Sequence, residues 1–256
     1  MSKLGDRIRR TIRVEAAPIG FRAVRPQKNP QLLVAVQFDS DDTDKVPQAV
    51  EKGAGAVLLK NAGGDDDIKA ASQAAGEVPL GAWPKQVDAE AVAALVEAGA
   101  DFLVFDAEST PACALLGEKL GYVLTLRGGQ DENYLRVLES VVLDAVLIED
   151  YAGPLTLQKQ VELRLVAGLT RKPLMLPVKL PIEGDDLECL RDAGVSVLMI
   201  DGSDSKTVDE LPSLLQAIEA LPGPRRRRET SLEVLLPRAA ELAGAEEEEE
   251  EGEEGE

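Results

Sequence analysis

The chain has 256 residues, of which 44% are hydrophobic and only 3% aromatic, and its formal net charge is −19. The hydrophobic content excludes global disorder, and the shortage of aromatic residues indicates a core of Val, Leu, Ile and Ala, as in a parallel sheet covered by helices. The acidic balance argues against nucleic acid as a partner and against general binding to anionic membranes.

The few cysteines and the lack of histidine limit the cellular compartments and the types of catalytic site that the sequence allows. The two cysteines, Cys113 and Cys189, are far apart in the sequence, which is typical of a reducing compartment. No apolar run approaches the ~20 residues of a membrane span, and residues 1–20 lack the hydrophobic core of a signal peptide, so we expect a cytoplasmic protein. The sequence contains no histidine, which excludes Ser-His-Asp triads and histidine metal sites.

The charge divides the chain into four predicted segments. Residues 1–29 form a basic extension with eight Lys or Arg against two acids, and residues 30–222 form the body of the protein. Residues 223–240 combine four consecutive arginines with a short amphipathic piece, and residues 241–256, with ten Glu, are predicted to be a disordered tail. The oppositely charged ends suggest a homo-oligomer or a protein partner held through them, by an attraction that salt would weaken.

The basic extension contains a predicted helix. In LGDRIRRTIRV (residues 4–14) the side chains of Leu4, Ile8 and Ile12 fall on one helical stripe among arginines. Such a helix has three uses: covering one end of the body, binding a partner, or lying on an anionic surface. The first is the simplest, because it needs no other molecule.

Short apolar runs alternate with amphipathic runs in the body of the chain. The predicted strands are residues 32–38, 56–60, 79–83, 101–106, 122–127, 145–149, 173–177 and 197–201. Helical patterns lie between them, among them residues 88–100, 131–142, 184–195 and 208–221. Eight strands and eight helices in alternation predict an α/β protein with a single (βα)8 TIM barrel. An open doubly wound sheet is the alternative, but the similarity among the even-numbered strands favours the closed barrel.

Polar residues stand at the ends of the predicted strands. The even-numbered strands end on Lys60, Asp106, Glu149 and Asp201, and the corresponding residues of the odd-numbered strands are Gln37, Lys85, Arg127 and Lys179. Strand alternation turns the even set inward with Leu58, Val104, Leu147 and Met199. Because barrel enzymes carry their sites at this end, the ring predicts a binding or catalytic site. The alternative is a plug in which cations and anions pair and close the mouth.

The C-terminal half of the body resembles a known superfamily. Residues 182–204 (IEGDDLECLRDAGVSVLMIDGSD) resemble the last loops of the ribulose-phosphate-binding barrels, which include indole-glycerol-phosphate synthase and orotidine-phosphate decarboxylase. The resemblance implies a phosphate held by backbone N–H groups of Gly184, Gly202 and Ser203. The sequence departs from the family pattern by lacking the glycine pair after strand seven and the decarboxylase's Asp-x-Lys-x-x-Asp motif. Four carboxylates also stand near the expected phosphate: Asp185, Asp186, Asp201 and Asp204.

These residues predict lysine and carboxylate chemistry. A lysine in a partly desolvated mouth can form a Schiff base with a carbonyl substrate, and Lys60 and Lys85 are the candidates. Asp106 or Glu149 would then transfer protons, and Arg127 would hold a substrate carboxylate or phosphate. The remaining predicted binding residues are Gln37, Lys179, Asp201, Gly184, Gly202 and Ser203. The expected activity is that of a lyase or isomerase acting on a small anionic carbonyl metabolite.

Two alternatives remain open at the level of sequence. No cofactor is expected, although Asp106, Glu149 and Asp201 would supply three oxygen ligands for Mg²⁺ if the nearby lysines left them free. The second alternative is a non-catalytic barrel that serves as a binding or assembly module.

Overall fold

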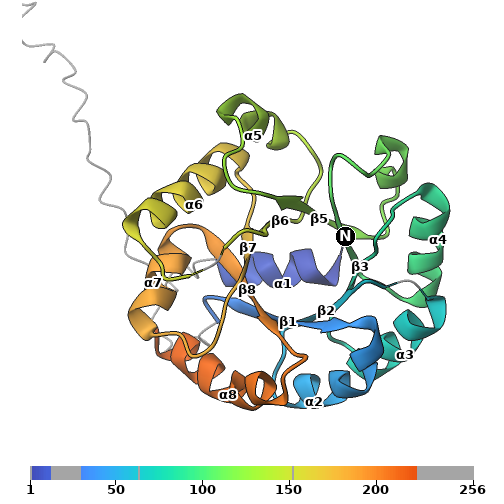
Figure 1. Ribbon diagram of the computed structural model, residues 1–256, viewed down its shortest axis with the longest axis horizontal. Helices are drawn as coiled ribbons and strands as arrows, with labels where there is room; N and C mark the ends of the chain where they lie inside the picture. Colours follow the sequence, from blue (N-terminus) through green and yellow to red (C-terminus); the bar gives the residue numbers. More distant parts are fainter. Residues whose placement is uncertain (1, 13–29, 63, 152, 224–256) are drawn as a thin grey trace, which may run out of the picture. The chain divides into compact units, whose positions relative to one another are not determined.

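The protein is a closed barrel of eight parallel strands. The structure, a computed structural model, describes residues 2–12, 30–62, 64–151 and 153–223. Within these ranges the strands pair in chain order from β1 to β8, and β8 closes onto β1 (Figure 1). The predicted TIM barrel is therefore confirmed. Most of the predicted arginine-rich segment, the poly-Glu tail and residues 13–29 lie outside the described residues.

The strands fall close to the predicted apolar runs. They are β1 (Leu33–Asp39), β2 (Ala56–Lys60), β3 (Leu80–Trp83), β4 (Phe102–Phe105), β5 (Gly121–Leu126), β6 (Ala145–Ile148), β7 (Leu174–Pro177) and β8 (Val195–Asp201). The predicted boundaries differ from these by at most two residues, because apolar runs of this kind are buried on both sides and end where the chain leaves the core.

Helices surround the barrel. They are α2 (Val46–Glu51), α3 (Asp65–Ala75), α4 (Ala89–Ala98), α5 (Glu132–Leu138), α6 (Leu157–Thr170), α7 (Gly184–Asp192) and α8 (Ser205–Ala220), and the 3-10 helix η1 (Ser40–Lys45) precedes α2. The alternation has one departure, since the connection between β4 and β5 holds only a short 3-10 helix, η2 (Ala112–Leu115). Pro111 precedes η2 and Gly117 follows it, and both residues disfavour a longer α-helix.

Strand alternation sorts the apolar residues into two cores. Side chains such as Leu58, Val104 and Leu147 fill the barrel interior, whereas Leu59 and Phe105 belong to the larger core beneath the surrounding helices. Both assignments agree with the register predicted for the even strands. The polar residue two positions after each inward-facing apolar residue therefore also faces inward, at the mouth of the barrel.

The helix α1 (Lys3–Ile12) covers the opposite end of the barrel, where the strands begin. Leu4 and Ile8 are fully buried in the interior core, whereas Ile12 is half exposed. The guanidinium of Arg7 donates to the carbonyl oxygens of Gly55, at 2.8 Å, and Glu77, at 3.0 Å. These contacts confirm that the described part of the basic extension covers the barrel.

Two carboxylates from the starts of strands bind the first turn of α1. The backbone N–H groups of Lys3 and Leu4 donate to the two oxygens of Asp101, at 2.7 and 2.8 Å. The hydroxyl of Ser2 donates to Asp144 at 2.5 Å and accepts from the N–H of Gly5. Because the N–H groups of a first helical turn have no partner within the helix, these carboxylates satisfy them and favour the helix dipole. Among the described residues no helix is both long and apolar enough to cross a membrane.

The barrel should depend on this helix for stability. We expect Ile8→Ala to lower the free energy of unfolding by about 2–4 kcal/mol, because it leaves a cavity beneath the barrel. Ile12→Ala is the matched control and should change it by less than about 0.5 kcal/mol, because Ile12 is half exposed. Urea denaturation of both variants measures the difference; equal effects would show that α1 does not seal the barrel.

Candidate functional site

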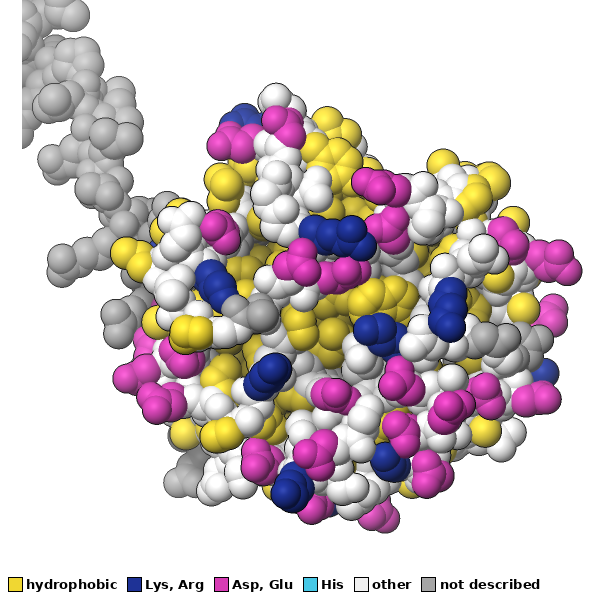
Figure 2. Space-filling view, viewed as in Figure 1, with side chains coloured by type: hydrophobic (Ala, Val, Ile, Leu, Met, Phe, Trp, Pro, Cys, Tyr) yellow, Lys and Arg dark blue, Asp and Glu magenta, His cyan; other side chains and the backbone are white. Residues whose placement is uncertain are grey.

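A cavity of about 790 Å³ opens at the C-terminal ends of β2 to β6. Five predicted site residues line it: Lys60, Lys85, Asp106, Arg127 and Glu149. Figure 2 views this end of the barrel and shows a hollow with an apolar floor, surrounded by charged side chains of both signs. The site is therefore an open pocket.

The two sets of predicted residues lie at different depths. Lys60 and Glu149 stand two residues after the inward-facing Leu58 and Leu147 and therefore face inward, as predicted. In β3 and β5, however, the inward residues at the mouth are Trp83 and Thr125, and Lys85 and Arg127 stand two residues further along the chain. Lys85 and Arg127 thus lie one inward step beyond Trp83 and Thr125, two pocket residues that the sequence analysis did not identify.

Lys60 lies over an aromatic ring in the pocket. It pairs in register with Trp83 of the neighbouring strand, and its Nζ is 5.1 Å from the centre of the indole ring. Both side chains point inward, so the ring positions the amine at the pocket wall. Lys85 is exposed at the rim. Lys60 is therefore the lysine that the structure positions best.

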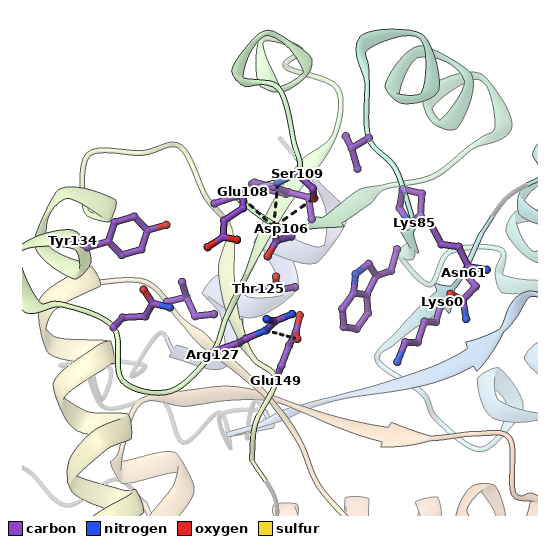
Figure 3. Close-up of a pocket in the computed structure, with 17 residues that line it drawn as sticks. Lys60, Asn61, Lys85, Asp106, Glu108, Ser109, Thr125, Arg127, Tyr134 and Glu149 are labelled. Carbon is purple, nitrogen blue, oxygen red and sulfur yellow. Dashed lines mark hydrogen bonds and ion pairs between the residues drawn. The ribbon is translucent and has the colours of Figure 1, made fainter.

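Asp106 has one bound oxygen and one free oxygen. Its Oδ1 accepts hydrogen bonds from the N–H groups of Glu108, at 2.9 Å, and Ser109, at 3.1 Å (Figure 3). Its Oδ2 has no hydrogen-bond partner within the described part of the chain. The turn after β4 thus orients the carboxylate and leaves one oxygen available to a ligand.

Arg127 and Glu149 form a loose pair across β5 and β6. The Nε of Arg127 lies 3.7 Å from Oε2 of Glu149, and the Arg127 side chain is 72% exposed. This is the only ion pair within the predicted ring for the residues that the structure describes. Charge pairing therefore does not close the mouth as the plug interpretation required.

The sequence interpretation missed Thr125, at the floor of the pocket. Its side chain lines the cavity although the residue is only 5% exposed. Its hydroxyl makes no hydrogen bond to another described residue, and Figure 3 shows it on the side of the pocket that faces Asp106. A lone hydroxyl in the apolar strand YVLTL (residues 122–126) was the available signal. A buried hydroxyl without a protein partner is a natural contact for a ligand.

Solved structures of other proteins share this fold. The barrel is similar to an HpcH/HpaI aldolase from Desulfitobacterium hafniense (14% identity, TM-score 0.56), covering 76% of this chain and 95% of that one. It is also similar to a 3-hexulose-6-phosphate synthase (15%, TM-score 0.56, 74% and 99% covered) and to KGPDC from Streptococcus mutans (9%, TM-score 0.62, 75% and 99% covered). No protein-family model and no curated protein sequence matches the chain.

The fold shared with these proteins is a closed barrel of eight parallel strands. At these identities the similarity concerns the fold alone, so the site must be judged from its own residues.

The predicted phosphate donors lie outside the pocket. The N–H of Gly202 donates to the carbonyl oxygen of Gln37 at 2.7 Å, and the N–H of Ser203 donates to Oδ1 of Asp201 at 2.9 Å. A Cβ on Gly202 would lie 2.4 Å from the ring of Phe38, so packing alone requires this glycine. Both N–H groups would have to exchange these partners to bind a phosphate.

The other predicted residues outside the pocket are also dispersed. Gln37 pairs in register with Asp201 between β1 and β8, Lys179 is exposed after β7, and Gly184 begins α7. Asp201 is therefore separate from the pocket that Asp106 and Glu149 line. Among the described residues no three carboxylate or cysteine side chains are grouped closely enough to hold a metal ion.

The pKa of Tyr134 reports on the charge of the pocket. Burial raises this pKa above its ordinary value, and the negative charges of Asp106 and Glu108 raise it further. We expect Asp106→Asn to lower the pKa of Tyr134, because the substitution removes one of these charges while keeping the oxygen that accepts the turn hydrogen bonds. Tyr122 is the internal control, since burial rather than a carboxylate raises its pKa. Titration of the tyrosine Cζ resonances by NMR measures both; an unchanged Tyr134 would contradict the proximity of Asp106.

Proposed function

We propose that the protein is a lyase of the aldolase type that acts in this pocket on a small carbonyl compound bearing a carboxylate. The observation that carries the proposal is that Lys60, Asp106 and Arg127 line one open cavity. An amine, a carboxylate with a free oxygen and an exposed guanidinium are the groups needed to bind and cleave a hydroxylated 2-oxo acid. The aldolase and the synthase among the similar structures support this choice of reaction.

Each group has a defined role in the proposed reaction. The neutral amine of Lys60 attacks the carbonyl carbon and water leaves, which forms an iminium ion. The iminium accepts the electron pair when the carbon–carbon bond breaks, and Oδ2 of Asp106 takes the proton from the hydroxyl of the departing fragment. Protonation of the resulting enamine and hydrolysis then release the second product and restore the amine. The Thr125 hydroxyl is placed to donate to the substrate's carbonyl oxygen during the attack.

The anionic group of the substrate is proposed to be a carboxylate rather than a phosphate. In the strand-eight turn, the N–H groups of Gly202 and Ser203 are bound within the protein, and Asp201 already supplies the negative charge there. Arg127, in contrast, is largely exposed beside the pocket and is held at only one nitrogen by Glu149. Its free N–H groups match the two oxygens of a carboxylate.

Borohydride trapping tests the mechanism directly. We expect reduction in the presence of a 2-oxo acid such as pyruvate to leave a stable adduct on the peptide that contains Lys60, detected by mass spectrometry. Lys60→Met should abolish the adduct, whereas Lys85→Met, the matched control at the rim, should retain it. An adduct on Lys85, or none on either lysine across a panel of 2-oxo acids, would refute the Schiff-base mechanism.

Arg127→Met tests the substrate class. The substitution removes the hydrogen-bonded ion pair between the guanidinium and the substrate carboxylate. We therefore expect the 2-oxo acid concentration for half-maximal trapping to rise about tenfold or more relative to the original chain. A neutral ketone should be trapped equally by the variant and the original chain. If dihydroxyacetone phosphate is trapped at lower concentration than any 2-oxo acid, the assignment of a carboxylated substrate is wrong even though the lysine chemistry stands.

A further inference from the structure

The neighbouring helices α5 and α6 expose an unusual number of aliphatic side chains. On α6 these are Leu157, Val161 and Leu165, which are 76%, 53% and 42% exposed. They are spaced four residues apart and therefore form one stripe, while Leu163 of the same helix is buried. The helix is thus apolar on its outer side as well as on the side that packs on the barrel.

The end of α5 continues this apolar surface. Val137, Val141 and Val142 are exposed there, and Val142 is 83% exposed. The amine of Lys172 donates to the carbonyl oxygen of Val141 at 2.7 Å, and Arg171 pairs with Glu139 at 3.0 Å, so the ends of the two helices lie side by side. We call these six residues the α5–α6 face: Val137, Val141, Val142, Leu157, Val161 and Leu165. Figure 2 shows hydrophobic side chains along this edge of the barrel.

The charge around the α5–α6 face differs from that of the rest of the chain. The two helices and the turns after them carry five basic and four acidic side chains: Arg136, Lys159, Arg164, Arg171, Lys172, Glu132, Glu139, Asp144 and Glu162. The chain as a whole carries −19. This edge is close to neutral, so two copies meet little mutual repulsion along it, and each offers both signs of charge to the other.

We propose that the α5–α6 face is where two copies of this chain associate, with the α6 stripes packed against each other about a two-fold axis. An isologous contact of this kind requires a surface that complements itself, and an aliphatic helix stripe flanked by both signs of charge does so. The 14-residue helix α6 is only about 20 Å long. The interface is thus at the small end of specific contacts, and the dimer should dissociate on dilution.

Sedimentation equilibrium of the full chain tests this proposal. At physiological salt we expect a reversible dimer over roughly 1–100 µM protein, the range in which small interfaces exchange. Val161→Asp places a charge at the centre of the stripe and should raise the dissociation constant by about tenfold or more. Leu116→Asp is the matched control, because Leu116 is 80% exposed on the β4–β5 connection, outside the face, and should leave the dimer unchanged.

The dependence on salt distinguishes this dimer from pairing through the charged termini. Because each copy carries −19, added salt should screen the repulsion and strengthen association through an apolar face. Pairing of the basic extension of one copy with the acidic tail of another should weaken instead. A monomer at all concentrations, or a dimer that salt dissociates and Val161→Asp leaves intact, would overturn the proposal. Val142→Asp, at the most exposed valine, repeats the test if Val161→Asp lowers the melting temperature.

Discussion

The closure of eight alternating strands into one cylinder is the constraint on which the rest of the structure depends. Once the barrel closes, every second side chain of a strand points to the barrel axis, so it must either pack in the interior or lie at one of the two open ends. The interior is closely packed, and Gly81 lacks a side chain where the ring of Phe102 approaches within 2.2 Å of its Cβ position. The polar residues of the mouth face inward because the apolar residue two positions before each of them also faces inward.

The two ends of the barrel use their polar groups differently. Where the strands begin, both oxygens of Asp101 and one oxygen of Asp144 are hydrogen-bonded to residues 2–4, and the interior is sealed by Leu4 and Ile8. Where the strands end, the hydroxyl of Thr125 and one oxygen of Asp106 have no partner within the described residues. A helix of the same chain thus covers the end where the strands begin, whereas the end where they finish keeps polar groups available to a ligand.

Much of this arrangement could be predicted from the sequence, because it follows from local periodicity. The strands, their inward and outward faces, and the inward direction of Lys60 and Glu149 all depend on an alternation that is visible in the residues themselves. The height of a residue in the barrel depends instead on how each strand registers with its neighbours. That is why Trp83 and Thr125, rather than Lys85 and Arg127, form the layer next to the core. The missing α-helix between β4 and β5 has a local cause, in Pro111 and Gly117, and could have been predicted.

The position of α1 also constrains the order in which the protein assembles. This helix is near the start of the chain, yet it is anchored by residues 98 and 142 positions downstream, at the beginnings of β4 and β6. During synthesis on the ribosome its apolar stripe emerges long before the carboxylates that receive it. The helix thus reaches its native contacts only after five of the eight strands have been made, so the base of the barrel closes after most of its wall.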